Sequence, residues 1–88
     1  MKVLFTRQFL KEIRKIKDKN LARKVEDAIR NIQLSNSISE VKGIKKLIGS
    51  QHAYRIRIGD YRMGLYETKT HLEISRFLHR REIYKYFP

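Results

Sequence analysis

The first half of the chain carries apolar residues at helical spacing. Residues 2–6 alternate weakly between polar and apolar and predict a short strand, after which Thr6 can cap a helix. Residues 18–20 interrupt the helical pattern, so two helices are predicted. The apolar stripe of the first is Phe9, Leu10, Ile13 and Ile16, and that of the second is Leu21, Val25, Ala28, Ile29 and Ile32. We expect a helical hairpin with both stripes turned to one core.

From residue 41 onward the apolar period changes to about two, which is typical of strands. Turn residues at 59–60 and 69–70 separate the strands, and residues 81–86 predict a short helix or tail. The predicted strands are 44–48, 53–58, 61–67 and 71–78. The order β-α-α-β-β-β-β predicts an α+β fold. A small antiparallel sheet would be covered on one face by the helical hairpin, in a single domain spanning residues 1–88.

Charge changes this picture most. The chain has 21 Lys and Arg against 9 Asp and Glu, a formal net charge of +12. Such self-repulsion disfavours a compact chain and is most simply explained by a polyanionic partner. Nucleic acid is the first candidate, an acidic protein the second and an anionic membrane surface the third. A merely solubilising surface is the plain alternative.

Several classes of protein are disfavoured by what the sequence lacks. Without cysteine there is no disulfide framework and no thiolate metal site. The N-terminal residues lack the apolar run of a signal peptide, and no window approaches the roughly 20 apolar residues of a membrane span. We therefore expect a soluble, cytoplasmic protein that makes no use of the membrane.

The strand 53–58 alternates cleanly and predicts an arginine-rich face. Tyr54, Ile56 and Ile58 should face the helices, which places Arg55 and Arg57 on the opposite face, about 7 Å apart. Arg62 in the next strand should join them, and Gly64 would keep that face shallow enough for a nucleic-acid backbone. Because arginine binds phosphate oxygens through two hydrogen bonds at once, such a face predicts an anion site. A solvated polar face is the alternative.

The segment from Leu78 to Tyr84 combines an imidazole, two guanidiniums and a phenol. His79 is suited to proton transfer near neutral pH, and Tyr84 could stack on a base or orient a phosphate. Alternatively, Ile83 and Tyr84 only pack the tail onto the sheet, and His79 only ends a strand. The His, Asp and Glu spacings predict no metal site, and there is no glycine-rich phosphate loop.

Three runs together resemble the RelE/ParE superfamily of type II toxin–antitoxin toxins. They are residues 44–47 (IKKL), 54–62 (YRIRIGDYR) and 79–84 (HRREIY). The resemblance covers nearly the whole chain. It implies a microbial RNase fold and an endoribonuclease that cuts mRNA in the decoding site of the ribosome. In the RelE-like branch the ribose 2′-OH attacks the adjacent phosphate, without a metal or any other cofactor.

The resemblance also implies roles for individual residues. Arg55 and Arg57 match positions where some members hold lysines at the scissile site, Arg62 and Arg80 match phosphate-stabilising arginines, and Tyr84 matches a tyrosine that positions the substrate. We expect neighbouring bases to contact RNA or the ribosome; they are Lys45, Lys46, Arg76, Arg81 and Lys85.

One departure from the family pattern concerns the general base. Arginine stays protonated and cannot accept a proton from the 2′-OH. His79 then becomes the candidate base, with Glu67 or Glu82 behind it. Alternatively, the arginines act only by stabilising charge in the transition state.

The family further implies a cognate antitoxin, acidic and partly disordered, that covers the arginine face or displaces the tail. Two other functions stay open at this point. One is a ParE-like inhibitor of DNA gyrase, and the other is an RNA- or ribosome-binding protein without catalysis.

Overall fold

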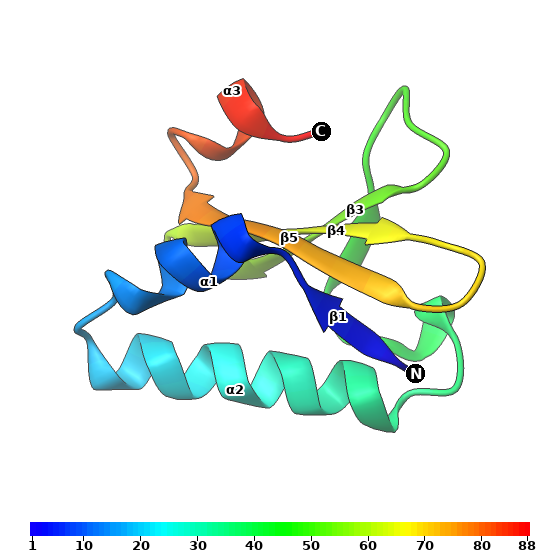
Figure 1. Cartoon of the computed structure of the whole chain (residues 1–88), viewed down its shortest axis with the longest axis horizontal. Coiled ribbons are helices and arrows are strands. Elements are labelled where there is room, and N and C mark those ends of the chain that lie inside the picture. The colour runs from blue at the N-terminus through cyan, green and yellow to red at the C-terminus, as the bar shows by residue number, and fades with distance from the viewer.

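The computed structural model describes all residues, 1–88, as a five-stranded sheet between two helical layers. Helices α1 (Arg7–Arg14) and α2 (Lys19–Leu34) cover one face, and the short helix α3 (Ile83–Tyr86) lies over the other (Figure 1). The strands are β1 (Val3–Phe5), β2 (Ile44–Lys46), β3 (Ala53–Ile58), β4 (Tyr61–Glu67) and β5 (Leu72–His79). The predicted α+β architecture is confirmed, and no helix has the length and apolar character needed to cross a membrane.

Both long helices begin at side-chain caps. The Thr6 hydroxyl accepts a hydrogen bond from the Phe9 N–H (3.0 Å) and donates to the Ser75 carbonyl (2.7 Å), so this cap also ties α1 to β5. The Asp18 carboxylate accepts from the N–H groups of Asn20 and Leu21 at the start of α2. The predicted interruption at 18–20 is therefore the boundary between the two helices, because the cap satisfies N–H groups that have no partner within the helix.

One strand differs from the predicted antiparallel arrangement. The sheet order is β1-β5-β4-β3-β2, and β1 pairs parallel with β5, whereas every other pair is antiparallel. The two helices after β1 return the chain so that β2 starts at the far edge of the sheet. The last strand, β5, then lies beside β1.

The core lies between the sheet and the two long helices. Ile56 and Ile58 face it, as alternation predicts, and Met63 and Leu65 of β4 are fully buried beside them. From the helices come Phe9, Val25 and Ile32. Burial of each such side chain contributes about 1.5–3 kcal/mol to folding, so this face of the sheet is fixed by its apolar residues.

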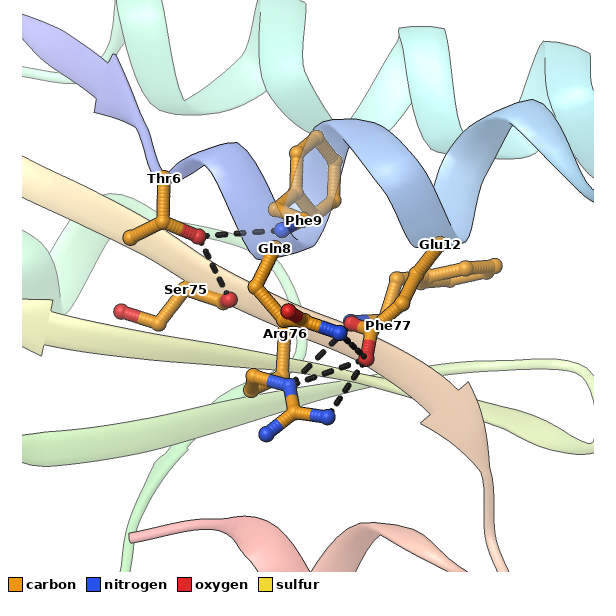
Figure 2. Close-up of polar contacts among 7 residues, drawn as sticks. All are labelled: Thr6, Gln8, Phe9, Glu12, Ser75, Arg76 and Phe77. Carbon is orange, nitrogen blue, oxygen red and sulfur yellow. Dashed lines mark hydrogen bonds and ion pairs between the residues drawn. The ribbon is translucent and has the colours of Figure 1, made fainter.

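Helix α1 closes an edge of β5 that β1 is too short to cover. On the β1 side no strand accompanies β5 beyond Ile74, and Glu12 takes the place of the missing neighbour. Its carboxylate is 5% exposed and accepts from the Phe77 N–H (2.8 Å) and from two nitrogens of Arg76 (2.6 Å from Nη2, 3.0 Å from Nε). Figure 2 shows these contacts converging on the Glu12 carboxylate. Arg76, predicted to bind RNA or the ribosome, is thus engaged in a structural ion pair.

The tail builds a second, smaller core on the opposite face of the sheet, here called the tail face. Ile83 and Phe87 are buried against Ala53, with Leu47, Tyr66 and Leu78 around them. The Phe87 ring lies directly over Gly64, where an added Cβ would come within 2.8 Å of the ring. The expectation that Gly64 leaves a shallow surface for a nucleic-acid backbone is therefore wrong, since Phe87 occupies that surface.

Substitution of Gly64 by alanine should lift the tail from the sheet. Because the new methyl group would overlap the Phe87 ring, we expect a loss of about 1–3 kcal/mol in the free energy of unfolding, measured by urea denaturation. Phe87→Ala removes the obstructing ring, so the double variant should lose less than the two single losses added together. Strict additivity would show that the ring and Gly64 are not in contact.

Candidate functional site

A cavity of about 660 Å³ lies on the tail face, between the β2–β3 edge and the C-terminal tail. We call it the tail pocket. Its lining combines cationic, aromatic and apolar side chains: Lys45, Lys46, Leu47, Ile48, Arg55, Tyr84, Phe87 and Pro88. A nucleotide would suit this lining, because its base can stack on a flat ring beside apolar walls and its phosphate can bind the convergent cations.

Arg55 is the most constrained cation in this pocket. Strand alternation turns it away from α1 and α2, and the side chain is only 8% exposed. No carboxylate pairs with it, since the two ion pairs of the structure are Arg76–Glu12 and Lys85–Glu82. Its register partner on β2 is Lys45, a second cation. A largely desolvated charge without a counter-ion costs free energy, and an anion in the pocket would offset that cost.

Tyr84 supplies the aromatic wall of the pocket. It projects from α3 and is 56% exposed, while its neighbours Ile83 and Phe87 are buried. The two buried residues are four positions apart on one side of the short helix, and they anchor it to the sheet. The ring of Tyr84 is thereby held beside Arg55 with its surface available to a base.

Three further predicted arginines gather at the β3–β4 turn. Arg57 and Arg62 are register partners, so their side chains share the tail face with Arg55. The Arg62 Nη1 donates to the carbonyls of Gly59 (3.0 Å) and Tyr61 (2.9 Å), which fixes the guanidinium against the turn. The Arg80 N–H donates to the Asp60 carbonyl (2.8 Å), so this arginine begins the tail beside the same turn. None of the three lines the tail pocket.

His79 lies on the other face of the sheet. Its register partner is Tyr61, and the two rings meet edge-on at 5.5 Å, whereas the adjacent Leu78 packs on the tail face. The His79 Nδ1 accepts the Arg81 N–H (3.1 Å), which places the proton of the neutral ring on Nε2. The structure does not bring His79 together with Arg55, and its role as general base stays a prediction.

Glu67 and Glu82, the two carboxylates expected to support His79 as the base, also lie away from the tail pocket. Glu67 accepts from the Tyr54 hydroxyl (3.3 Å) on the helix-covered side of the sheet. Desolvation by burial, followed by the negative charge of Glu67 and this hydrogen bond, raises the pKa of Tyr54. Glu82 lies 3.9 Å from Lys85 in an exposed pair. Neither carboxylate lines the tail pocket, and no three His, Asp or Glu side chains gather closely enough to hold a metal ion.

Comparison with known proteins assigns the family. Residues 3–84 match the family described as ParE toxins of type II toxin–antitoxin systems, parDE. The chain belongs to the RelE/ParE superfamily of type II toxins. It is 38% identical over 89 residues to Toxin RelE3 of Methanocaldococcus jannaschii, and the match covers all of both proteins.

Solved structures agree with this assignment. The toxin resembles a chain of the RelB–RelE antitoxin–toxin complex from Methanococcus jannaschii, with a TM-score of 0.78, 35% identity and coverage of 97% of this chain and 99% of the other. It shares its fold with a chain of the RelE–RelB complex from Pyrococcus horikoshii, with a TM-score of 0.73, 21% identity and coverage of 93% and 97%.

The structure sorts the toxin's predicted contact residues. Lys45 and Lys46 line the tail pocket, Arg81 and Lys85 are exposed on the tail, and Arg76 is held by Glu12. Sequence reasoning missed the apolar walls of the pocket: Leu47, Ile48, Phe87 and Pro88. The four-residue spacing of Ile83 and Phe87 was the one local sign that the tail has a buried side.

Proposed function

We propose that this toxin is a RelE-like endoribonuclease that cuts mRNA on the ribosome and is neutralised by a cognate antitoxin. The observation that carries the proposal is Arg55, a buried cation without a counter-ion that shares a cavity with the exposed ring of Tyr84. A phosphate at Arg55 with its base on Tyr84 would satisfy both side chains. The family assignment supports this reading.

In the proposed reaction the 2′-oxygen forms a bond to the adjacent phosphorus while the bond from phosphorus to the 5′-oxygen breaks. The 2′-OH loses its proton and the leaving 5′-oxygen gains one, which gives a 2′,3′-cyclic phosphate and a 5′-OH. Arginine donors aimed at the non-bridging oxygens stabilise the negative charge that develops, an effect worth roughly 10²–10³ in rate per group. Among the side chains lining the pocket, only Lys45, Lys46 and Tyr84 can exchange a proton.

The proposed antitoxin would be acidic and would fold on binding. Of the 21 Lys and Arg side chains only two take part in ion pairs, so the surface of the toxin stays strongly positive. Such a surface attracts an acidic, disordered chain and accelerates its capture. The action on ribosomes would take place in the cytoplasm.

The direct test is induction of the toxin followed by primer-extension mapping of mRNA ends. We expect growth arrest and new ends within translated codons. Arg62→Ala and Tyr84→Ala, both checked for folding by circular dichroism, should reduce cutting. The expected loss is about 10²-fold or more for Arg62→Ala and about tenfold for Tyr84→Ala, which removes the ring on which the base would stack. His79→Ala tests the predicted base in the same assay. If folded Arg62→Ala and Tyr84→Ala leave toxicity and cutting unchanged, the proposal is wrong.

A gyrase inhibitor is the second candidate, favoured by the ParE description of the matching family. A supercoiling assay with purified toxin separates the two functions. Inhibited gyrase with intact mRNA would replace the proposed activity by the ParE-like one. Binding to ribosomes without cut ends would leave a non-catalytic RNA-binding protein.

A further inference from the structure

A second groove, of about 330 Å³, lies between α2 and the free end of β3. We call it the α2–β3 groove. Three exposed cations line it, Lys24, Lys42 and Arg57, together with Asp27 and Asn31. Apart from Arg57, none of these residues belongs to the site described above.

The groove exists because β2 is short. Its pairing with β3 reaches only as far as Ile44 opposite Ile56, so at Arg57 the edge of β3 that faces away from β4 has no neighbouring strand. The Ala53 carbonyl accepts the Leu47 N–H, so the main-chain polar groups of Ala53 point toward β2. Along a strand the N–H and carbonyl groups of every second residue point to the same side. The N–H and carbonyl of Arg57 therefore point toward the side that β2 has left.

The polar groups of the groove are mainly hydrogen-bond donors, and they surround an apolar floor formed by Ala28, Ile56 and Ile58. None of its three cations takes part in an ion pair, and Asp27 is the single acid in the lining. The Asn31 Oδ1 accepts the Lys42 N–H (2.9 Å), which fixes the Lys42 backbone and leaves the Asn31 Nδ2 to donate. Ammonium, guanidinium, amide and main-chain N–H groups are the donors that contact phosphate oxygens in nucleic-acid complexes.

We propose that the α2–β3 groove binds the phosphate backbone of an RNA strand that continues from the tail pocket. The tail pocket opens on the tail face and the groove opens on the α2 side of the sheet, so the RNA strand would pass round the free edge of β3. Arg57 lies at that edge, two residues or about 7 Å along the strand from Arg55 in the pocket. The inference rests on the proposed function, because it extends the path of the same substrate.

An acidic peptide is the competing occupant, and the lining disfavours it. A peptide that folds on binding depends on buried apolar anchors. The exposed large apolar side chains of the toxin all lie outside the groove: Leu4, Phe5, Leu10, Leu34, Ile48, Tyr84 and Tyr86. A phosphate backbone needs only the donors that the groove presents.

The test measures binding of uncleavable RNA by fluorescence anisotropy. The probes are a labelled 2′-O-methyl oligonucleotide of about 10 nucleotides and a dinucleotide that fills only the tail pocket. In Lys24→Gln/Lys42→Gln we expect about tenfold weaker binding of the longer probe, a salt slope smaller by about 1.4, and unchanged binding of the dinucleotide. The matched control is Lys11→Gln/Lys17→Gln, which removes the same charge from exposed positions that line neither cavity.

Two results would overturn the inference. An equal loss in the control pair would mean that general charge, rather than the groove, binds the strand. Weaker binding of poly-glutamate with unchanged binding of RNA would make the groove a peptide site. Because 2′-O-methyl RNA cannot be cut, failure of this binding test is distinguishable from failure of the toxin to cleave mRNA.

Discussion

Replacement of Arg55 by methionine should reduce mRNA cutting by about 100-fold or more and, at the same time, make the protein more stable. The loss of cutting follows from removal of the one guanidinium inside the tail pocket, a group of the kind that lowers reaction barriers by several kcal/mol. The gain in stability follows from removal of a charge that is 8% exposed and has no acidic partner. A methionine of similar length would pack against the same apolar walls.

The gain in the free energy of unfolding should be about 1 kcal/mol, or roughly 4–8 °C in the midpoint of thermal unfolding. Cutting is followed by mapping mRNA ends, and stability by thermal and urea denaturation. Arg30→Met, an exposed position on α2, is the matched control and should change neither quantity appreciably. A variant that still cuts at the original rate, or that unfolds more easily, would show that Arg55 is a structural residue.

The arginine face could be predicted from the sequence because alternation is a local property. Arg55 and Arg57 occur between apolar residues within a single strand, and the short turn after Ile58 fixes the register that brings Arg62 opposite Arg57. No knowledge of distant parts of the chain is needed for this step. Burial of Arg55 depends instead on the tail, about thirty residues later, and no local pattern indicates it.

A single extra residue in β5 decides on which face of the sheet His79 lies. Gly64 pairs with Arg76 but Leu65 pairs with Ile74, so Ser75 is an extra residue in β5. The bulge places both Ile74 and Phe77 in the core, although they are three positions apart and strict alternation would put them on opposite faces. From Phe77 onward alternation then turns His79 toward the helices, away from the arginines.

The pairing of β1 with β5 could not be predicted from the local sequence either. A three-residue strand can pair with any free edge, and the parallel choice follows from where two helices return the chain. The role of Glu12 depends on this pairing, because β1 leaves part of the edge of β5 uncovered. Glu12 carries its charge on the buried side of α1, where a sequence-based reading expects apolar residues, and only the uncovered edge of β5 explains it.

Replacement of Glu12 by alanine should destabilise the toxin by about 3 kcal/mol, a large fraction of the 5–15 kcal/mol typical of a whole domain. The change leaves the Phe77 N–H buried without an acceptor and the Arg76 guanidinium, 21% exposed, without its counter-ion (Figure 2). Removal of one partner of a buried pair costs about 3–5 kcal/mol, and the partial exposure of Arg76 places the expected loss at the low end.

Equilibrium unfolding in urea measures this loss, and a double-mutant cycle apportions it. Glu12→Gln keeps an oxygen that can accept from Phe77 but loses the charge, so it should fall between wild type and Glu12→Ala. Arg76→Met leaves the carboxylate with the Phe77 N–H, and the loss in Glu12→Ala/Arg76→Met should be smaller than the two single losses combined. A loss below about 1 kcal/mol in Glu12→Ala would mean that water reaches the edge of β5, and that α1 does not close it.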